Sequence, residues 1–372
     1  MQQDFMDKKL QDRFRQNAYR RLQLAMGEHD FFSNDYLGIS KNGLIEAALA
    51  NSSFSHGSTG SRLLAGNYPL MEETEQQIAQ FHQAPAALIF NSGYDANLGL
   101  LSCVPQREDT ILYDKLSHAS IRDGIRLSRA QAFSFAHNDL DDLERKLQKK
   151  TGHCFVVTES VFSMDGDTAP LQEMVVLCER AGARLIVDEA HATGVVGSQG
   201  EGLTQQEGLH LRCFARIYTF GKALGCHGAA VTGSEMLRNY LINFSRPFIY
   251  TTALPPAATA AIKASYEIFP ALNTERTQLN LLISFFQKNR TLHTESGETF
   301  SFHNSLTPIQ CLVIPGNEKV KQVANRLTGL KMDIRPILHP TVPEGEERLR
   351  ITLHSFNTLE EAEALISGIR GG

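Results

Sequence analysis

Three short segments carry side chains that could do chemistry together. They are Val161-Phe-Ser-Met-Asp-Gly166, Asp188-Glu-Ala-His191-Ala-Thr-Gly194 and Thr219-Phe-Gly-Lys222-Ala-Leu-Gly225. A lysine among glycines can have a lowered pKa and form a Schiff base with a carbonyl. An aspartate can keep a pyridinium nitrogen protonated, which makes the ring an electron sink, while hydroxyls and loop amides can bind a phosphate. Each residue alone is weak evidence, and the ordered set is what indicates a site.

Two upstream segments add candidates. His118, in Leu116-Ser-His118-Ala-Ser, could stack on a flat ring or could cap a helix or fill a core position, and the sequence leaves these alternatives open. In Asn91-Ser-Gly93-Tyr94-Asp-Ala-Asn97, the glycine permits a tight turn, and the amides that open a following helix form an anion site.

Short apolar runs alternate with helical stretches and must position these side chains. We expect helices over 140–150 and 171–181, and strands over Ala87–Phe90, Thr110–Tyr113, Phe155–Glu159, Arg184–Glu189, Arg216–Phe220 and Ala229–Gly233. This alternation predicts an α/β fold with a mainly parallel central sheet. In such sheets ligands bind beyond the carboxyl ends of the strands, where the three segments fall.

The pattern changes after Leu254-Pro255-Pro256. A helical stretch over 257–290 is broken at Pro270 and near Asn273. We expect strands over Ile309–Ile314 and Leu349–Leu353, a helix over Lys319–Leu327, and a last helix opened by a capping box, Thr358-Leu-Glu-Glu361. The sequence thus predicts an N-terminal helical arm (1–28), a large cofactor-binding domain (29–262) and a smaller α+β domain (263–372).

Composition narrows the function classes. The 372 residues carry a formal net charge of −5, which argues against bulk nucleic-acid binding. No apolar run is long enough for a membrane span and no signal-peptide pattern is present, so we expect no membrane association. The six scattered cysteines predict reduced thiols, a cytoplasmic location and no metal site.

The first 26 residues nevertheless carry more basic than acidic side chains, which indicates either a solvated amphipathic helix or an arm over an anionic substrate.

The ordered set of segments resembles the pyridoxal-phosphate (PLP) α-oxoamine synthases of fold type I. The resemblance runs from Ser33-Asn34-Asp-Tyr-Leu-Gly38 to Arg348-Leu-Arg350-Ile-Thr-Leu. It implies an enzyme that condenses an amino acid with an acyl thioester and releases carbon dioxide. Within the family, Asp114-Lys-Leu-Ser-His-Ala-Ser-Ile121, Phe135-Ala-His-Asn-Asp139 and Pro340-Thr-Val-Pro343 favour the biotin-pathway branch, which joins L-alanine to pimeloyl-CoA or a pimeloyl carrier protein.

The resemblance also implies roles for individual residues. Lys222 would form the Schiff base with the cofactor and remove the substrate proton, Asp188 would pair with the pyridine nitrogen, His118 would stack on the ring, and His191 would contact its phenolic oxygen. Arg350 and Asn34 would hold the amino-acid carboxylate. The remaining cofactor contacts would come from Gly93, Tyr94, Ser163 and Thr219, and from Thr251 and Thr252 of the neighbouring subunit in a homodimer. An acyl-binding arginine would be Arg20 or Arg21, and either Arg335 or His339 would face the substrate.

Rival functions share the same cofactor residues. Sibling enzymes join glycine to acetyl-CoA or serine to palmitoyl-CoA, and Lys222 cannot separate them from the alanine-specific branch. A non-catalytic subunit of a homologous complex would lack the lysine, so the presence of both Lys222 and Asp188 argues against that reading. No glycine-rich dinucleotide fingerprint follows a first strand, which argues against a dehydrogenase.

Overall fold

The computed structural model describes residues 4–22, 24 and 27–371. They form two compact units. The terminal unit comprises Met1–Tyr36, Met164–Asp167 and Thr277–Gly372, and the central unit comprises Leu37–Ser163 and Thr168–Arg276. The division into arm, cofactor domain and small domain stays a prediction, and residues 1–3, 23, 25 and 26 of the predicted arm and residue 372 of the predicted small domain lie outside the described residues.

The central unit is built on one seven-stranded sheet. The strand order is β2 (Ala86–Phe90), β8 (Ala229–Gly233), β7 (Ala215–Thr219), β6 (Arg184–Asp188), β5 (Cys154–Glu159), β3 (Thr110–Asp114) and β4 (Gln131–Phe135). From β7 to β4 all neighbours are parallel, and β8 runs antiparallel to both of its neighbours. The expected α/β fold with a mainly parallel sheet is therefore confirmed.

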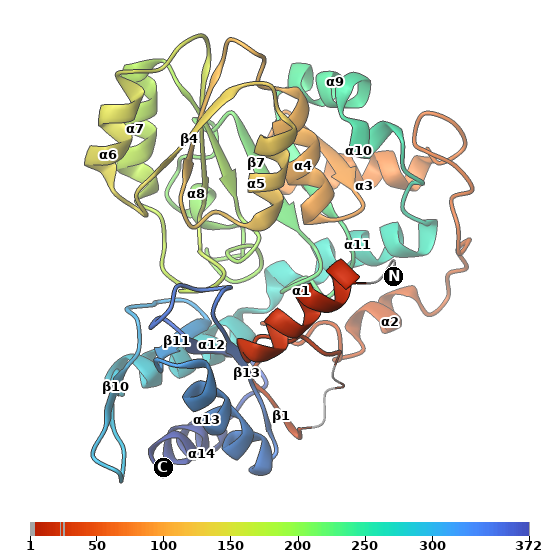
Figure 1. Cartoon of the computed structure of the whole chain (residues 1–372). Coiled ribbons are helices and arrows are strands. Elements are labelled where there is room, and N and C mark those ends of the chain that lie inside the picture. The colour runs from red at the N-terminus through yellow and green to blue at the C-terminus, as the bar shows by residue number, and fades with distance from the viewer. Residues whose placement is uncertain (1–3, 23, 25–26, 372) are drawn as a thin grey trace. The chain divides into compact units, whose positions relative to one another are not determined.

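Helices follow most strands and bury both faces of the sheet, whose strands β2 and β5 are buried along their whole length. In Figure 1, α4 lies beside α5 and α6 lies beside α7 around the sheet. The helices of this unit are α2 (Leu44–Leu49), α3 (Pro69–Phe81), α4 (Gly93–Cys103), α5 (Ala119–Leu127), α6 (Leu140–Leu147), α7 (Leu171–Ala181), α8 (Leu203–Gln206), α9 (Glu235–Phe244), α10 (Arg246–Ile249), α11 (Pro256–Ile268) and the 3₁₀ turn η1 (Phe269–Ala271). One hydrophobic core joins Leu88 and Ile186 of the sheet to Leu100 of α4, Ile121 of α5 and Leu241 of α9.

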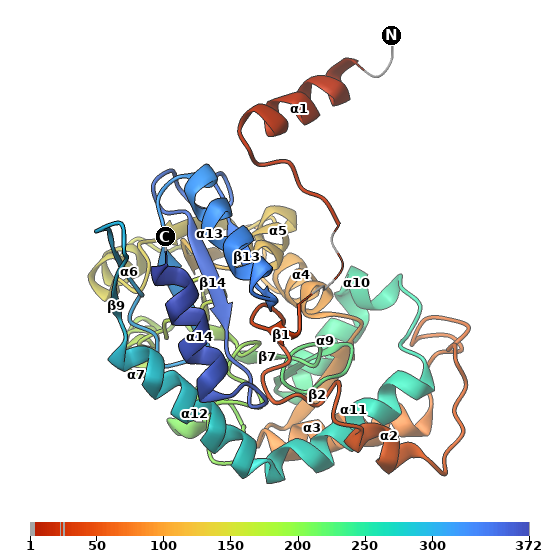
Figure 2. The ribbon, with the colours of Figure 1, turned by 90° about the horizontal axis from the view of Figure 1, so that it is seen from below.

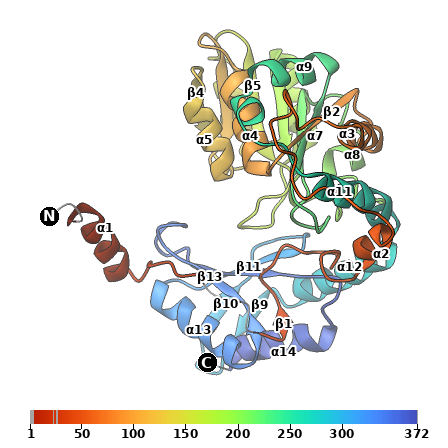
Figure 3. The same ribbon diagram turned by 90° about the vertical axis from the view of Figure 1, so that its right-hand side faces the viewer.

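The terminal unit contains a three-stranded antiparallel sheet in the order β11 (Ile309–Val313), β14 (Arg348–Thr352), β13 (Arg335–Ile337). Side chains alternate between the two faces of a strand, so Leu349 and Ile351 of β14 share one face while Arg348, Arg350 and Thr352 share the other. Helices α13 (Asn317–Gly329) and α14 (Leu359–Arg370) lie beside this sheet in Figure 3. The unit also contains two short pairs, β1 (His29–Asp30) with β12 (Met332–Asp333) and β9 (Thr291–His293) with β10 (Thr299–Ser301).

Local sequence signals explain several element ends. The capping box at Thr358 and Glu361 is present, with each side chain bonded to the other's backbone N–H. The helical stretch breaks around Pro270 as expected, because α11 ends at Ile268 and α12 (Asn273–Lys288) begins after η1.

The first helix is shorter than its sequence pattern indicated. Helix α1 (Asp4–Arg15) ends before Asn17, whose φ of 53° lies in the left-handed region and cannot continue a helix. None of its residues is buried, and Figure 2 shows α1 standing away from the rest of the terminal unit. Among the described residues, no helix is both long and apolar enough to cross a membrane.

Candidate active site

The carboxyl ends of β5, β6 and β7 place three polar side chains along one edge of the central sheet. Glu159 ends β5, Asp188 ends β6 and Thr219 ends β7. In the parallel register Glu159 is the direct partner of Asp188, so both carboxyl groups emerge on the same face of the sheet. The segments that follow carry His191 and Lys222, and the strand order thus brings together residues that are more than sixty positions apart in the chain.

Asp188 is buried and held in one orientation. One carboxylate oxygen accepts a hydrogen bond from Nδ2 of Asn97 at 2.7 Å, and the other accepts from the backbone N–H of Ala190 at 2.9 Å. Asn97 also donates to Oγ of Ser120 at 3.1 Å. Asn97 therefore links the carboxylate to the helix that carries His118, a role that our sequence analysis missed although Asn97 lies in the segment quoted for its anion site.

His118 is the N-cap of α5. Its Nδ1 accepts from the backbone N–H of Ser120 at 3.2 Å and lies 2.8 Å from the hydroxyl of the same residue. Burial is the main cause that lowers the pKa of the imidazole; Asp188 acts in the opposite direction, while the charge of Lys222 lowers it further. His118 thus caps a helix, which is one of the alternatives that the sequence left open. Its ring is neutral at pH 7. Stacking of the ring on a cofactor stays a prediction.

Glu159 is a second buried carboxyl group that the sequence analysis did not select. Its Oε1 accepts the backbone N–H of His118 at 2.7 Å. Burial and the neighbouring charge of Asp188 raise its pKa to about 8, against the lowering effects of that hydrogen bond and of Lys222. Glu159 is therefore a neutral acid at pH 7, and Asp188 is left as the acceptor at this edge. The one available signal was its position as the last residue of a predicted strand.

Lys222 lies in the loop after β7. Its amine donates to Oγ1 of Thr219 over 3.4 Å, and it is half-buried. The loop closes at Gly225, whose φ is +65° and where an added Cβ would lie 2.7 Å from the backbone nitrogen of Ser40. Only glycine fits there without strain. His191 is buried and lies three residues beyond Asp188.

The predicted phosphate contacts gather at the start of α4. Gly93 is the first residue of this helix, where unpaired backbone N–H groups favour an anion. An added Cβ at Gly93 would lie 2.4 Å from Cγ2 of Thr219, so these two predicted contacts are neighbours in space. Ser163 is half-buried in the loop after β5. The exposed Tyr94 instead donates its hydroxyl to Asp123 at 2.5 Å.

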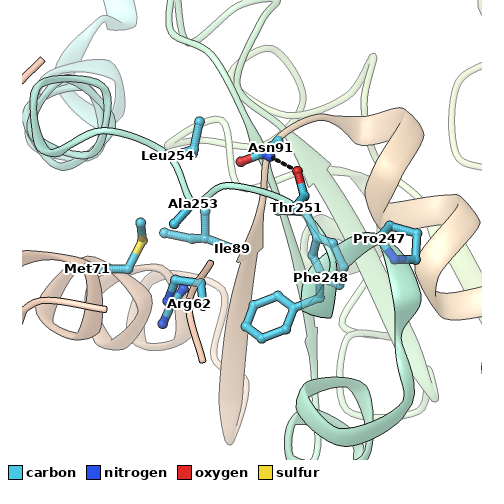
Figure 4. A pocket seen from close by; sticks show the side chains of 10 residues that line it. Arg62, Met71, Ile89, Asn91, Pro247, Phe248, Thr251, Ala253 and Leu254 are labelled. Atoms are coloured by element: carbon cyan, nitrogen blue, oxygen red, sulfur yellow. Dashed lines mark hydrogen bonds between the residues drawn. The ribbon is translucent and has the colours of Figure 1, made fainter. Parts of the chain in front are cut away.

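Thr251 and Thr252 lie beside the same helix start within their own chain. Figure 4 shows Nδ2 of Asn91 directed at Oγ1 of Thr251, 3.0 Å away. The same amide donates to the carbonyl oxygen of Thr252 at 2.9 Å. The small cavity in this view, about 10 Å³, is lined by Phe248 and Leu254 among others. That Thr251 and Thr252 complete the site of a neighbouring subunit stays a prediction.

The predicted carboxylate clamp lies in the terminal unit. Arg350 is the central residue of β14, and its guanidinium donates to Oγ1 of Thr352 and to Oδ1 of Asn34, each at 2.9 Å. The hydroxyl of Tyr36 donates to the same oxygen of Asn34 at 3.3 Å. Burial raises the pKa of Tyr36 to about 12, partly offset by Arg350, so this hydroxyl stays a donor. The two predicted carboxylate-binding residues are therefore in direct contact.

Of the remaining predicted substrate residues, Arg20, Arg21 and Arg335 border one cavity of the terminal unit, whereas His339 lines another. Arg20 donates to Oγ1 of Thr341 at 3.1 Å, and the guanidinium of Arg21 lies 5.8 Å from the ring centre of Tyr19. Arg335 is the direct cross-strand partner of Arg350, and its guanidinium covers the ring of Phe32 at 4.9 Å. The cavity that they line has a volume of about 1030 Å³.

The chain matches the family model described as aminotransferase class I and II over residues 29–369. The chain belongs to this family. Its relatives place it among the PLP-dependent α-oxoamine synthases, so it is an acyltransferase whose cofactor is PLP.

Three similar proteins show how far the likeness extends. The chain is 41% identical over 367 residues to an 8-amino-7-oxononanoate synthase of Emericella nidulans, covering 91% of this chain and 88% of that protein. It is 30% identical to the solved 8-amino-7-oxononanoate synthase of Francisella tularensis, with a TM-score of 0.76 and coverage of 92% and 96%. A serine palmitoyltransferase solved with PLP is 25% identical, with a TM-score of 0.84 and coverage of 99% and 94%.

The residues of the central unit fit the cofactor of this family. Gly93 lets the N-terminus of α4 lie against Thr219, because an added Cβ would lie 2.4 Å from Cγ2 of Thr219, and the N-terminus of a helix favours a phosphate. Oδ1 of Asn97 is buried among the described residues without a hydrogen-bond partner, next to the oriented carboxylate of Asp188. A carboxylate acceptor, a primary amine and an anion-binding helix end together match a pyridinium nitrogen, an aldehyde and a phosphate.

The terminal unit also contains a group that the sequence did not predict. One ligand atom each of Asp165, His303 and Cys311 lies within 4.8 Å of the others, a set that could hold a metal ion. Arg348 is buried there and pairs with the carboxylate of Asp165. Its guanidinium supplies a positive charge at the place where a metal ion would supply one, so we read this group as an ion-pair network.

Proposed function

We propose that this enzyme condenses L-alanine with a pimeloyl thioester, releasing carbon dioxide and the free thiol to give 8-amino-7-oxononanoate. The class of reaction follows from the family. The choice of substrates is supported by the relative of Emericella nidulans, which is 41% identical over most of both chains and carries that name. The observation that carries the proposed mechanism is the sheet edge at which Asp188 and the loop of Lys222 meet.

Bound PLP supplies an aldehyde for the amino group and a ring that accepts the electron pair left when the Cα proton is removed. Lys222 would have two roles: its amine would hold the cofactor when no substrate is bound, and the free amine would accept the Cα proton of the substrate. Thr219, the hydrogen-bond partner of Lys222, orients that amine. Placing the base beside the proton it removes is a precondition for this step.

Asp188 would pair with the ring nitrogen and favour its protonated form. Its two hydrogen bonds, from Asn97 and Ala190, fix the carboxylate without supplying a positive charge that would compete for it. The neutral Glu159 beside it cannot compete as an acceptor at pH 7. His118, held by Ser120 and Glu159, would stack on the ring. His191 would donate to the phenolic oxygen.

Arg350 and Asn34 orient the alanine carboxylate. A guanidinium binds a carboxylate through two parallel hydrogen bonds, which fixes the plane of the substrate as well as its position. Because the reaction depends on how the substrate is oriented as well as on whether it binds, this clamp would act on turnover as well as on affinity. Arg20, Arg21 and Arg335 would contact the anionic acyl donor, and Thr251 and Thr252 would serve the neighbouring subunit of a homodimer.

Product analysis tests this function. The purified enzyme is incubated with alanine, glycine or serine, each with pimeloyl-, acetyl- or palmitoyl-CoA and in parallel with a pimeloyl carrier protein, and products are identified by mass spectrometry. We expect 8-amino-7-oxononanoate from alanine and a pimeloyl donor at a kcat/KM at least about 100-fold above any other pair. Preference for glycine with acetyl-CoA or for serine with palmitoyl-CoA would overturn the proposal in favour of a sibling activity.

A further inference from the structure

The loop that carries Asn34 is joined to the end of β14 by backbone hydrogen bonds on both sides. The N–H of Thr352 donates to the carbonyl oxygen of Phe31 at 2.8 Å, and the N–H of Ser355 donates to the carbonyl oxygen of Tyr36, also at 2.8 Å. Asn34 lies between these two attachments. The position of its side chain therefore depends on what holds the interior of the loop.

The buried imidazole of His354 contacts that interior. Its Nε2 lies 3.1 Å from the hydroxyl oxygen of Ser33 and 3.1 Å from the carbonyl oxygen of the same residue, which directly precedes Asn34. Phe356 stacks on the imidazole, with the two ring planes 9° apart and their centres 4.7 Å apart. The ring is thus held in one orientation beside the loop.

The other ring nitrogen of His354 carries a proton. Nδ1 lies 3.0 Å from Oδ1 of Asn357, which also accepts the backbone N–H of His354 at 2.9 Å. The amide nitrogen of Asn357 donates to Oε2 of Glu361 at 3.1 Å and to the carbonyl oxygen of Asp30 at 3.2 Å, so the amide oxygen must face the histidine. An amide oxygen only accepts, and Nδ1 is therefore the donor.

The Nε2 side of the ring can bond Ser33 in either charge state. Burial lowers the pKa of the imidazole, while Asp30, whose carboxylate lies 3.9 Å from Nε2, acts in the opposite direction. In the neutral ring Nε2 accepts from the hydroxyl of Ser33, and in the charged ring it donates to the carbonyl oxygen of Ser33 instead. His354 thus holds Ser33 in both states.

The position of this loop matters to the clamp because Asn34 serves two partners. Its Oδ1 accepts from Arg350 at 2.9 Å and from Tyr36 at 3.3 Å, so its amide N–H groups are what it can offer to a carboxylate. A shift of the loop would remove a partner of Arg350 and misplace these N–H groups at the same time.

We propose that His354 is a positioning residue of the amino-acid carboxylate clamp. Through Ser33 it sets the reach of Asn34 to Arg350, and thereby the affinity of the enzyme for the carboxylate of its amino-acid substrate. The inference rests on the proposed function, because the clamp is part of that function. His354 acts through Ser33 and not by contact with the substrate.

Titration of the holoenzyme with L-alanine and with L-alaninamide, followed by the change in visible absorption, tests the inference without any turnover. L-alaninamide keeps the amino group and the methyl group but has a neutral amide in place of the carboxylate. The variant His354→Asn has a side chain too short to reach Ser33, whereas His354→Gln brings an amide N–H to the position of Nε2 and can donate to the carbonyl oxygen of Ser33. His29→Asn is the matched control, because it changes a histidine of the same unit that bonds Glu361 at 2.8 Å.

We expect His354→Asn to raise the dissociation constant of L-alanine about fivefold to tenfold and to leave that of L-alaninamide within about twofold of wild type. His354→Gln and His29→Asn should leave both constants within about twofold. Equal losses for the two ligands in His354→Asn would overturn the inference. A loss of alanine affinity of the same size in His354→Gln or in His29→Asn would overturn it as well.

Thermal melting shows whether each variant is folded. Because His354 is buried, Ser33→Ala is the second variant: it removes one hydroxyl from a half-buried residue and should raise the dissociation constant of L-alanine alone, about twofold to threefold. If His354→Asn does not fold, an unchanged alanine affinity in Ser33→Ala overturns the inference.

The outcome is separate from that of the proposed function. All amino acids share the carboxylate, so the titration is repeated with glycine or L-serine if product analysis favours one of them. That preference would refute the proposed substrates and leave the role of His354 standing, whereas equal losses for the amino acid and its amide would refute the role of His354 and leave the identity of the product unaffected.

Discussion

Glu159 and Asp188 are direct partners in the parallel pair of β5 and β6, and burial beside Asp188 raises the pKa of Glu159 to about 8. Asp188 has two hydrogen-bond donors aimed at its oxygens, whereas Glu159 has one backbone donor and is buried beside that charge. The sheet edge thus gives two carboxyl groups different environments, and such differences are how active sites assign different roles to paired carboxyl groups.

The first prediction concerns the pH dependence of stability. The pKa of Glu159 in the folded protein, about 8, lies above its ordinary value of 4.5. The folded state therefore keeps a proton that the unfolded chain has released, so the stability from this group is fully present below pH 4.5 and is lost as the pH rises through about 8. The variant Glu159→Gln mimics the protonated acid and cannot release a proton. Between pH 5 and 8, the free energy of unfolding of its cofactor-free form, measured in urea, should therefore fall less steeply than that of the wild type, by the slope that corresponds to about one proton. Identical pH profiles for variant and wild type would refute the assignment.

The second prediction concerns Lys222. Lys222→Ala should lower kcat by at least about a thousandfold, because the chain loses its proton acceptor, and should abolish the visible absorption band of the enzyme as purified. The half-buried lysine contributes little to the fold, so the melting temperature of the cofactor-free protein should stay within about 2 °C of wild type. A coloured and active variant would show that another amine has this role.

The third prediction concerns the carboxylate clamp. Arg350→Gln should lower kcat/KM for alanine by about 100-fold, with a fall in kcat as well as a rise in KM, because both binding and orientation are lost. Asn34→Ala removes one neutral partner of the clamp and should cost about tenfold. Arg290→Gln, which removes an exposed arginine of the same unit, is the control and should leave both constants unchanged. If Arg350→Gln raised KM and left kcat unchanged, Arg350 would contribute to substrate binding alone and not to orientation.

The fourth prediction concerns the start of α4. Gly93→Ala places a methyl group against Thr219 and should raise the dissociation constant of PLP about tenfold or more, measured by fluorescence titration of the cofactor-free protein. Gly57→Ala is the matched control, because no atom lies within 4 Å of its added Cβ. Equal PLP affinities in the two variants would show that the phosphate does not bind at this helix end.

The sequence predicted the strands that carry the site because each is short, almost entirely buried and rich in β-branched or other apolar residues. The expected bounds of β5, β6 and β7 differ from the observed ones by no more than one residue at either end. Strand β4 escaped prediction because it forms the edge of the sheet and exposes most of its side chains, so it carries no apolar run. Helix α1 was predicted too long because spacing alone does not reveal the left-handed residue at Asn17.

Other features depend on pairings that are not local in the sequence. The roles of Glu159 and Asn97 follow from strand register and from a hydrogen bond that spans ninety-one positions, neither of which a single sequence displays. Met164–Asp167 interrupts the central unit yet belongs to the terminal unit, where Ser305 and Thr307 donate to the carbonyl oxygen of Gly166. Arg335 was selected for its type, and only the strand pairing placed it beside Arg350.

In the strand order β11, β14, β13, Arg350 lies on the middle strand and Arg335 on an edge strand, and these positions tolerate sequence changes to different degrees. Arg350 lies on the middle strand, bonded on both sides, so an insertion near it would break two ladders at once. Arg335 lies on a three-residue edge strand, and the residues that follow it form a loop up to β14. Edge strands and loops tolerate insertions far better than central strands. Changes confined to the edge strand that carries Arg335 can therefore leave the pairing of the middle strand, and with it the position of Arg350, intact.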